Sequence, residues 1–165
     1  MEEPVLTGGC QCGAVRYALG AMPEGTSICH CRMCQKAVGG PFAVFAPVRL
    51  ADFAWTRGDP PAFRSSTAAE RHFCPACGTP LTFRYLHKPW IDVSLGSLDH
   101  PARVQPTLQV GVESRLPWLD GAFLDSLAGR ATDDPGVPEQ VRTLTNFQHP
   151  DHDTPDGWTA TRAEA

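Results

Sequence analysis

The stretch Cys74-Pro75-Ala76-Cys77-Gly78 holds two cysteines at the spacing of a metal-binding knuckle. A tight turn with this spacing brings both sulfurs to one ion, and backbone N–H groups of the turn can stabilise the thiolates. Gly78 supplies the permissive backbone that such a turn uses. A single Cys-x-x-Cys is also typical of a redox-active or simply buried pair, so the other cysteines of the chain decide its interpretation.

Two further cysteine clusters precede it, Cys10-Gln11-Cys12-Gly13 and Cys29-His30-Cys31-Arg32-Met33-Cys34. In Cys-x-Cys the side chains at positions i and i+2 point the same way, so both sulfurs can reach one ion. Distant pairs commonly complete one tetrahedral zinc site, and all-sulfur ligation favours zinc over magnesium or calcium. A thioredoxin-like redox motif would need a βαβ setting, which the sequence lacks. We therefore predict one structural zinc site with the ligands Cys10, Cys12, Cys74 and Cys77.

The middle cluster leaves three sulfurs, those of Cys29, Cys31 and Cys34, without an obvious fourth ligand. Three protein ligands leave one tetrahedral position open for water or substrate, as in catalytic zinc sites. Such a site would lower the pKa of a substrate thiol, which would then bind as a thiolate. We predict a second, open zinc site here, and the sequence leaves open whether zinc occupies it at rest.

Charged and polar residues surround the middle cluster. His30 is a candidate fourth ligand, a candidate proton donor, or a packed side chain, because in an extended segment it points away from the neighbouring sulfurs. Arg32 and Lys36 place positive charge beside the site, where they could attract a substrate carboxylate or form ordinary solvated surface. We predict catalytic roles for Cys29, Cys31, Cys34 and His30, and ligand binding by Arg32 and Lys36.

Other candidate residues have simpler interpretations. Phe42 and Phe45 follow a Gly-Gly turn and could form a wall of the pocket above the open site, or pack in the core. His72 could orient a zinc ligand through a hydrogen bond. Asp99 is expected to stabilise a turn rather than to contact substrate.

Short apolar segments separated by glycine and proline dominate the 165-residue chain, which has 15 Gly and 16 Pro. Such punctuation disfavours long helices. Alternating apolar residues predict strands at 14–19, 42–45, 53–56, 81–85, 90–95 and 108–112. Short helices are predicted at 31–37, 120–127 and 139–144. The expected fold is mainly β, with stacked antiparallel sheets and few short helices.

Composition restricts the organisation and the partners. We expect one zinc-binding domain over residues 1–130 and a polar, partly mobile C-terminal segment over 131–165. A net charge of −4 argues against a protein that coats nucleic acid. No signal peptide or membrane span is visible, so we expect no membrane partner. Seven cysteines suit metal binding in the reducing cytoplasm better than a disulfide framework. The oligomeric state stays open.

The three clusters together resemble the glutathione-dependent formaldehyde-activating enzyme family. The resemblance rests on Gly8-Gly9-Cys10-Gln11-Cys12-Gly13-Ala14-Val15-Arg16-Tyr17, on residues 29–36 and on Phe73-Cys74-Pro75-Ala76-Cys77-Gly78-Thr79. Residues 96–99 and 117–119 extend it, so that it covers roughly 7 to 125. It implies a β-tent fold and the same division of the cysteines, with Cys29, Cys31 and Cys34 at the site associated with glutathione.

The activity that this resemblance implies is a carbon–sulfur lyase reaction in reverse. Glutathione would add to formaldehyde and give S-hydroxymethylglutathione, which serves aldehyde detoxification. The implied partners are a small-molecule thiol and an aldehyde. Gln109 departs from the family pattern, in which histidine is frequent at this point. Two other hypotheses remain: a zinc-binding module without catalysis, and a thiol or metal sensor at the middle cluster.

Overall fold

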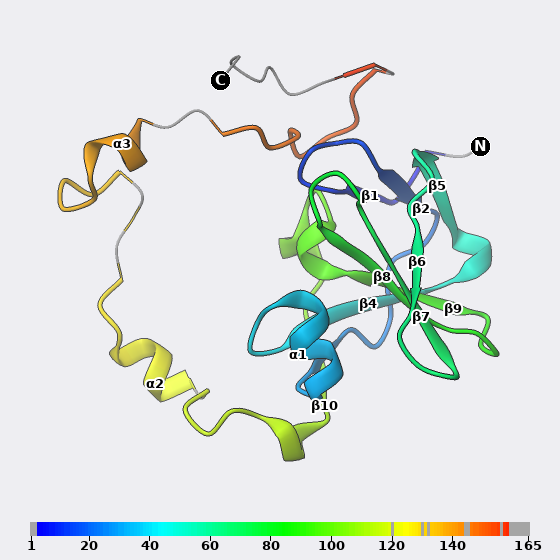
Figure 1. Cartoon of the computed structure of the whole chain (residues 1–165), viewed down its shortest axis with the longest axis horizontal. Helices are drawn as coiled ribbons and strands as arrows, with labels where there is room; N and C mark the ends of the chain where they lie inside the picture. Colours follow the sequence, from blue (N-terminus) through cyan, green and yellow to red (C-terminus); the bar gives the residue numbers. More distant parts are fainter. Residues whose placement is uncertain are drawn as a thin grey trace.

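The computed structural model describes residues 3–158 apart from 120, 130, 132, 144, 145 and 156. Its described part is mainly β, with ten strands in two sheets and three short α-helices (Figure 1). The strands are β1 (Leu6–Gly9), β2 (Arg16–Leu19), β3 (Ser27–Cys29), β4 (Ala43–Arg49), β5 (Phe53–Arg57), β6 (Ala62–Arg64), β7 (Ala69–Phe73), β8 (Pro80–Tyr85), β9 (Trp90–Ser94) and β10 (Leu108–Val110). The helices are α1 (Arg32–Val38), α2 (Gly121–Ser126) and α3 (Glu139–Arg142).

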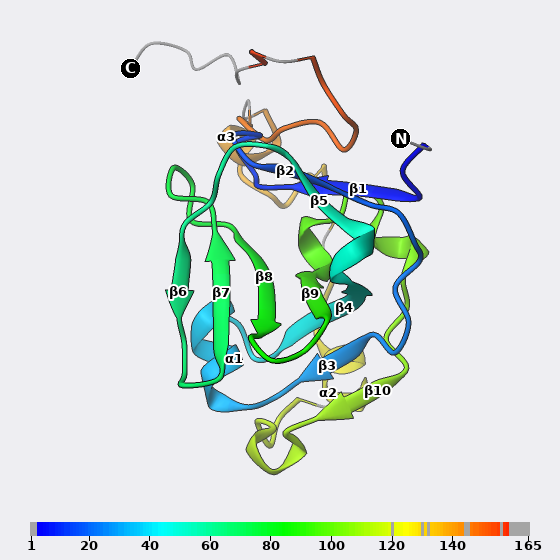
Figure 2. The same ribbon diagram turned by 90° about the vertical axis from the view of Figure 1, so that its right-hand side faces the viewer.

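The smaller sheet has the order β1-β2-β5, and all its pairs are antiparallel. The larger sheet has the order β10-β3-β4-β9-β8-β7-β6. Its pairs are antiparallel except that β10 runs parallel to β3. Figure 2 shows β1, β2 and β5 across the top of the larger sheet. The predicted mainly β fold of stacked sheets is therefore confirmed, with one parallel pair that the sequence did not indicate.

The main hydrophobic core lies between the two sheets. Tyr17 and Leu19 of β2 are fully buried and meet Leu81 and Val93 from the larger sheet. Tyr17 also stacks on Phe53 and lies edge-on to Trp55. Alternation along each strand puts these apolar side chains on the inner faces.

A second, smaller core lies around α1. Cys34 of α1 packs against the buried side chains of Ala43 and Phe45, and Val38 and Phe83 complete the cluster. Gly39 ends α1 in the left-handed conformation, as glycine does at many helix C-termini. The described part of the chain therefore has two apolar clusters, and each contains cysteines.

Beyond β10 the chain leaves the sheets and later returns to them. α2 and α3 lie apart from the sheets in Figure 1, within the regions where the sequence predicts helices; residues 120 and 144 of those predictions lie outside the described part. Residues 146–155 then return to the smaller sheet, where His149 donates its backbone N–H to the Gln11 carbonyl at 2.7 Å. No described helix has the length and apolar character needed to cross a bilayer.

Candidate metal centres

Two tight turns form the first cysteine cluster. Cys10 and Cys12 follow β1, and the Gly13 N–H donates to the Cys10 carbonyl at 3.0 Å. Cys74 and Cys77 lie between β7 and β8, where the Gly78 N–H donates to the Cys74 carbonyl at 2.9 Å. Both glycines have positive φ, 74° and 77°, which residues with a Cβ rarely adopt. The two turns thus have the same backbone hydrogen bond and a glycine of the same conformation, although one follows a strand of the smaller sheet and the other connects two strands of the larger sheet.

The four sulfurs of this cluster have a spacing that suits one zinc ion. Their Sγ atoms all lie within 4.8 Å of one another, with 3.6 Å from Cys10 to Cys12 and 3.8 Å from Cys12 to Cys74. Zinc–sulfur bonds of about 2.3 Å in a tetrahedron place sulfurs about 3.8 Å apart. Cys10 and Cys74 are buried at the edge of the main core. A metal here would therefore join the two sheets.

The surroundings of these sulfurs favour the thiolate form at one cysteine and oppose it at another. Burial alone would raise the pKa of Cys77, but hydrogen bonds from Thr79 outweigh it and lower the pKa to about 6. Burial raises the pKa of Cys10 strongly, although the Val15 N–H donates to its Sγ at 3.2 Å. Burial opposes the thiolate form of Cys10, and a metal cation bound by this cluster would offset that cost.

The second cluster combines a strand end with the start of a helix. Cys29 ends β3, Cys31 precedes α1, and Cys34 lies within α1. The three Sγ atoms lie within 4.8 Å of one another, with 3.6 Å between Cys29 and Cys31. Cys34 is buried, whereas Cys29 and Cys31 are partly exposed. Three sulfurs with one accessible side fit zinc with an open position.

The segment after β10 fixes this cluster from outside. The His30 N–H donates to the Val110 carbonyl at 2.9 Å. The buried Gln35 side chain donates to the carbonyls of His30 and Ser114. Gly111 comes so close that a Cβ there would lie 2.8 Å from the Cys31 nitrogen, and its φ is +65°. The parallel β10–β3 pair thus holds the cysteine-bearing loop.

Arg71 is a component of this site that sequence reasoning missed. It lies on β7, far from the cluster in sequence, and its Nη2 donates to Cys34 Sγ at 3.3 Å. Its guanidinium also lies 4.7 Å from the centre of the Phe83 ring, a cation–π contact. Burial raises the pKa of Cys34, and the bond from Arg71 opposes this rise. No motif surrounds Arg71, so its place beside Cys34 is known only from the structure.

His30 lies on the side away from the sulfurs. Its ring is buried, with Nε2 2.8 Å from Gln109 Oε1 and the Phe42 ring edge-on at 5.9 Å. It does not belong to the group of three sulfurs. Nδ1 has no hydrogen-bond partner within the described part of the chain. The alternation expected for an extended segment therefore accounts for its direction.

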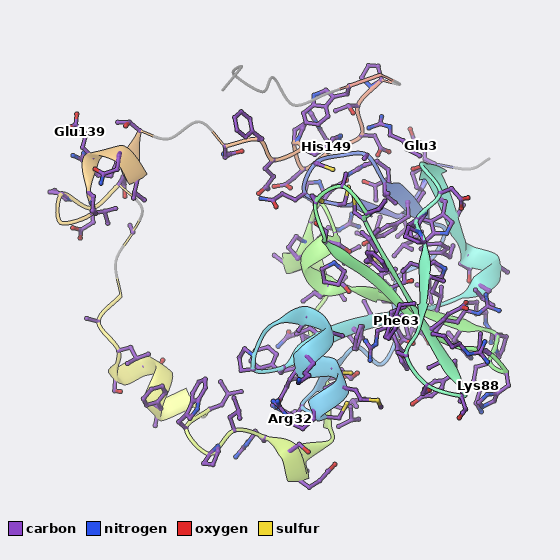
Figure 3. The ribbon with its side chains drawn as sticks, viewed as in Figure 1. Glu3, Arg32, Phe63, Lys88, Glu139 and His149 are labelled. Carbon is purple, nitrogen blue, oxygen red and sulfur yellow. The ribbon has the colours of Figure 1, made fainter. Side chains whose placement is uncertain are left out.

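The other predicted polar residues are distributed around the site. Arg32 lies on α1 (Figure 3) and donates to the Gln35 side chain. Lys36 lines a groove of about 610 Å³, together with Arg71 and Phe45. Phe42 lines a neighbouring cavity of about 440 Å³.

Two other polar residues have partners that the sequence did not indicate. The Nδ1 atom of His72 lies 2.8 Å from Thr82 Oγ1, and among the described residues no hydrogen bond joins His72 to a cysteine, so the expected bond that would orient a zinc ligand is not found there. Asp99 forms a buried ion pair with Arg16 instead of only stabilising a turn.

Comparisons with known proteins agree with this architecture. An uncharacterised lyase of Schizosaccharomyces pombe is 32% identical over 82 residues, which cover 50% of this chain and 59% of the relative. A crystal structure of a Rhodobacter sphaeroides protein has the same fold, with a TM-score of 0.52 at 24% identity over 63% of this chain and 99% of that chain. The profile of one enzyme family matches residues 5–114, which contain both cysteine clusters and more than half of the chain. The chain therefore belongs to the glutathione-dependent formaldehyde-activating enzyme family.

Proposed function

We propose that this protein is a zinc-dependent enzyme of the carbon–sulfur lyase type, which joins glutathione or a similar thiol to formaldehyde or another small aldehyde. The product is an S-hydroxymethyl adduct in the case of formaldehyde. The observation that carries the proposal is the three-sulfur cluster with two partly exposed members, beside a groove that contains cationic side chains. Family membership and the S. pombe relative's description as a lyase support the reaction class.

The two clusters have different tasks in this proposal. Cys10, Cys12, Cys74 and Cys77 hold a structural zinc, because four ligands leave no position for substrate. Cys29, Cys31 and Cys34 would hold a second zinc that leaves a position for the substrate thiol and favours its thiolate. None of the seven cysteines forms a disulfide, and a reducing compartment such as the cytoplasm suits such a protein.

The chemical step needs little beyond orientation and charge. The thiolate sulfur attacks the carbonyl carbon, a C–S bond forms, and the π electron pair of the carbonyl moves to its oxygen. That oxygen then takes up a proton, equal to the one lost by the thiol, from water at the exposed side of Cys29 and Cys31. Arg71 keeps a positive charge at the sulfurs and so favours the anionic state of the site.

His30 acts indirectly in this scheme. His30 lies between Cys29 and Cys31, and its hydrogen bond to Gln109 connects this segment to β10. The bond thereby holds the backbone that carries the two cysteines in place. We therefore assign it the positioning of the cysteines.

A Cys34→Ser variant tests the proposal. It should lose all thiol-dependent acceleration of formaldehyde consumption, while native mass spectrometry should show one bound zinc in place of two. A Met22→Ser variant, altered at an exposed apolar residue that belongs to neither cysteine cluster nor the groove lining, should keep both properties. Undiminished activity of Cys34→Ser would rule out this scheme and favour a zinc-binding module without catalysis.

A further inference from the structure

A groove of about 610 Å³ lies between α1 and the hairpin of β6 and β7. Met33 and Lys36 line it from α1, Phe63 from β6, Arg71 from β7 and Phe45 from β4. Arg71 is the residue that connects it to the three-sulfur cluster, since the same guanidinium lines the groove and contacts Cys34. A ligand in the groove would therefore end beside that cluster.

The wall of this groove is apolar and accessible. Phe63 and Met33 are 61% and 59% exposed, unusually high fractions for large apolar side chains. Phe63 is labelled on its strand in Figure 3. Pro80, Val38 and Ala62 continue the apolar lining. Exposed apolar residues gathered in a concave site indicate a binding surface rather than scattered surface residues.

The charges in this groove have one sign. Lys36 and Arg71 are its two cationic lining residues, and no carboxylate lines it. Neither cation forms an ion pair with a described residue. The groove therefore complements an anion that also has a substantial apolar part.

The groove has more apolar wall than a one-carbon aldehyde could cover. Its volume lies within the range of about 300–1,000 Å³ that is typical of sites for whole organic ligands. A one-carbon unit occupies about as much space as one water molecule, roughly 30 Å³. Glutathione is itself highly polar, so it would leave the apolar wall uncovered.

We propose that this groove binds the adduct of a carboxylate-bearing thiol with an aldehyde much larger and more apolar than formaldehyde. The carboxylate lies at Lys36 and Arg71, and the alkyl group derived from the aldehyde covers Phe63 and Met33. This inference rests on the proposed function for the thiol, and it specifies the aldehyde class.

Calorimetric titration of the full-length, reduced, zinc-loaded protein tests this with thioethers that cannot react. S-hexylglutathione should bind at least about tenfold more tightly than S-methylglutathione, because its longer chain buries more methylene groups. Phe63→Ser should reduce this ratio to below about threefold. Lys36→Gln should weaken both thioethers by the same factor, and Met22→Ser should change neither. Phe63 and Met22 are exposed, so thermal melting should show that both variants fold.

Three results would overturn the inference. They are equal affinities for the two thioethers, an unchanged ratio in Phe63→Ser, and tighter binding of octanoate than of S-hexylglutathione, which would indicate a fatty-acid site. The proposed function fails separately, if the protein accelerates no thiol-dependent aldehyde consumption. Formaldehyde turnover without a preference for S-hexylglutathione would leave that function intact and refute this inference alone.

Discussion

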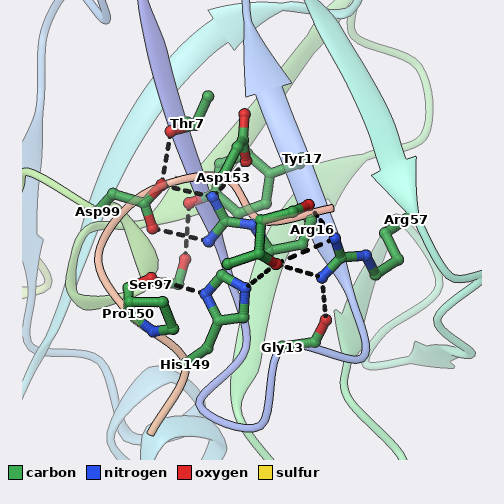
Figure 4. Close-up of polar contacts among 11 residues, drawn as sticks. Thr7, Gly13, Arg16, Tyr17, Arg57, Ser97, Asp99, His149, Pro150 and Asp153 are labelled. Carbon is green, nitrogen blue, oxygen red and sulfur yellow. Dashed lines mark hydrogen bonds and ion pairs between the residues drawn. The ribbon is translucent and has the colours of Figure 1, made fainter. Parts of the chain in front are cut away.

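At the scale of single residues, Arg16 shows how much one buried charge depends on its partners. The residue is 2% exposed, and its guanidinium donates to both carboxylate oxygens of Asp99 at 2.7 and 2.5 Å and to Asp153 at 2.5 Å (Figure 4). Thr7 donates to the same Asp99 carboxylate. Asp99 is buried, whereas the Asp153 side chain is 54% exposed. The two ion pairs therefore differ in solvation although they share one cation.

We predict that Asp99→Ala destabilises the fold by about 3–5 kcal/mol, because it leaves a buried cation with one solvated partner. Asp153→Ala is the matched control and should cost less than about 1 kcal/mol. Urea unfolding of both variants measures the difference. Similar losses of unfolding free energy in the two variants would mean that the buried ion pair stabilises the fold no more than the exposed one.

Asp92 gives a second prediction, which concerns pH. Burial raises the pKa of this carboxyl from 3.8 to about 6, and it has no hydrogen-bond or ion-pair partner among the described residues. Ionisation therefore opposes folding: the cost is complete above pH 6 and disappears as the pH falls below about 4. Asp92→Asn should stabilise the protein by up to about 3 kcal/mol at pH 8 and by about half of that at pH 5. Chemical denaturation at the two pH values checks this, and an equal gain at both would contradict it.

At the scale of elements, the strands that could be predicted are those with apolar alternation. Predicted strands at 53–56, 81–85 and 90–95 coincide with β5, β8 and β9. The missed strands are short or carry charges on their outer face. β7 reads Ala69-Glu70-Arg71-His72-Phe73, and its polar residues conceal the alternation that places Arg71 beside Cys34. The division of the cysteines into two clusters could be predicted from their spacing in the sequence. The position of the Arg71 cation beside Cys34 could not, because it depends on how the strands assemble.

Gly111 yields a prediction at this scale, because it lies where β10 meets the Cys31 loop. Gly111→Ala would introduce both a positive-φ strain of about 1–2 kcal/mol and a clash with the Cys31 backbone. Gly39→Ala is the control, since its φ is +67° but nothing lies within 4 Å of the added Cβ. Only Gly111→Ala should lose the zinc of the three-cysteine cluster, as counted by native mass spectrometry. Equal zinc retention in both variants would show that β10 does not hold this loop.

At the scale of the whole molecule, the C-terminal segment packs on the smaller sheet beside the first cysteine turn. Arg57 donates to the Gly13 carbonyl and to the backbone and side chain of Thr154. The His149 ring lies so close to Gly13 that a Cβ there would be 2.2 Å from Cδ2. The sequence could not indicate this packing, because the segment is polar and its partners lie more than 90 residues away. We propose that the described residues of 146–158 belong to the folded unit.

Truncation tests this proposal. A chain that ends at residue 145 should melt at least about 5 °C lower than the full chain, because it loses the contacts of Arg16, Arg57 and Gly13 with the segment. Alkylation of Cys12 should also become faster in that chain. A chain that ends at residue 158 is the control and should match the full-length protein. Identical melting of all three chains would show that the segment does not belong to the folded unit.

The separation of the two cysteine clusters along the chain has a consequence for biosynthesis. The three-sulfur cluster is complete once Cys34 has been made, whereas the four-sulfur cluster must wait for Cys77, 43 residues later (77 − 34). At about 5–20 residues per second, this interval lasts roughly 2–9 s on the ribosome. During that interval the chain contains all three sulfurs of one centre but only two of the four that would join the sheets. Because β10 and Gly111, which hold the three-cysteine loop, are made later still, the four-sulfur centre has its full ligand set before that loop is fixed.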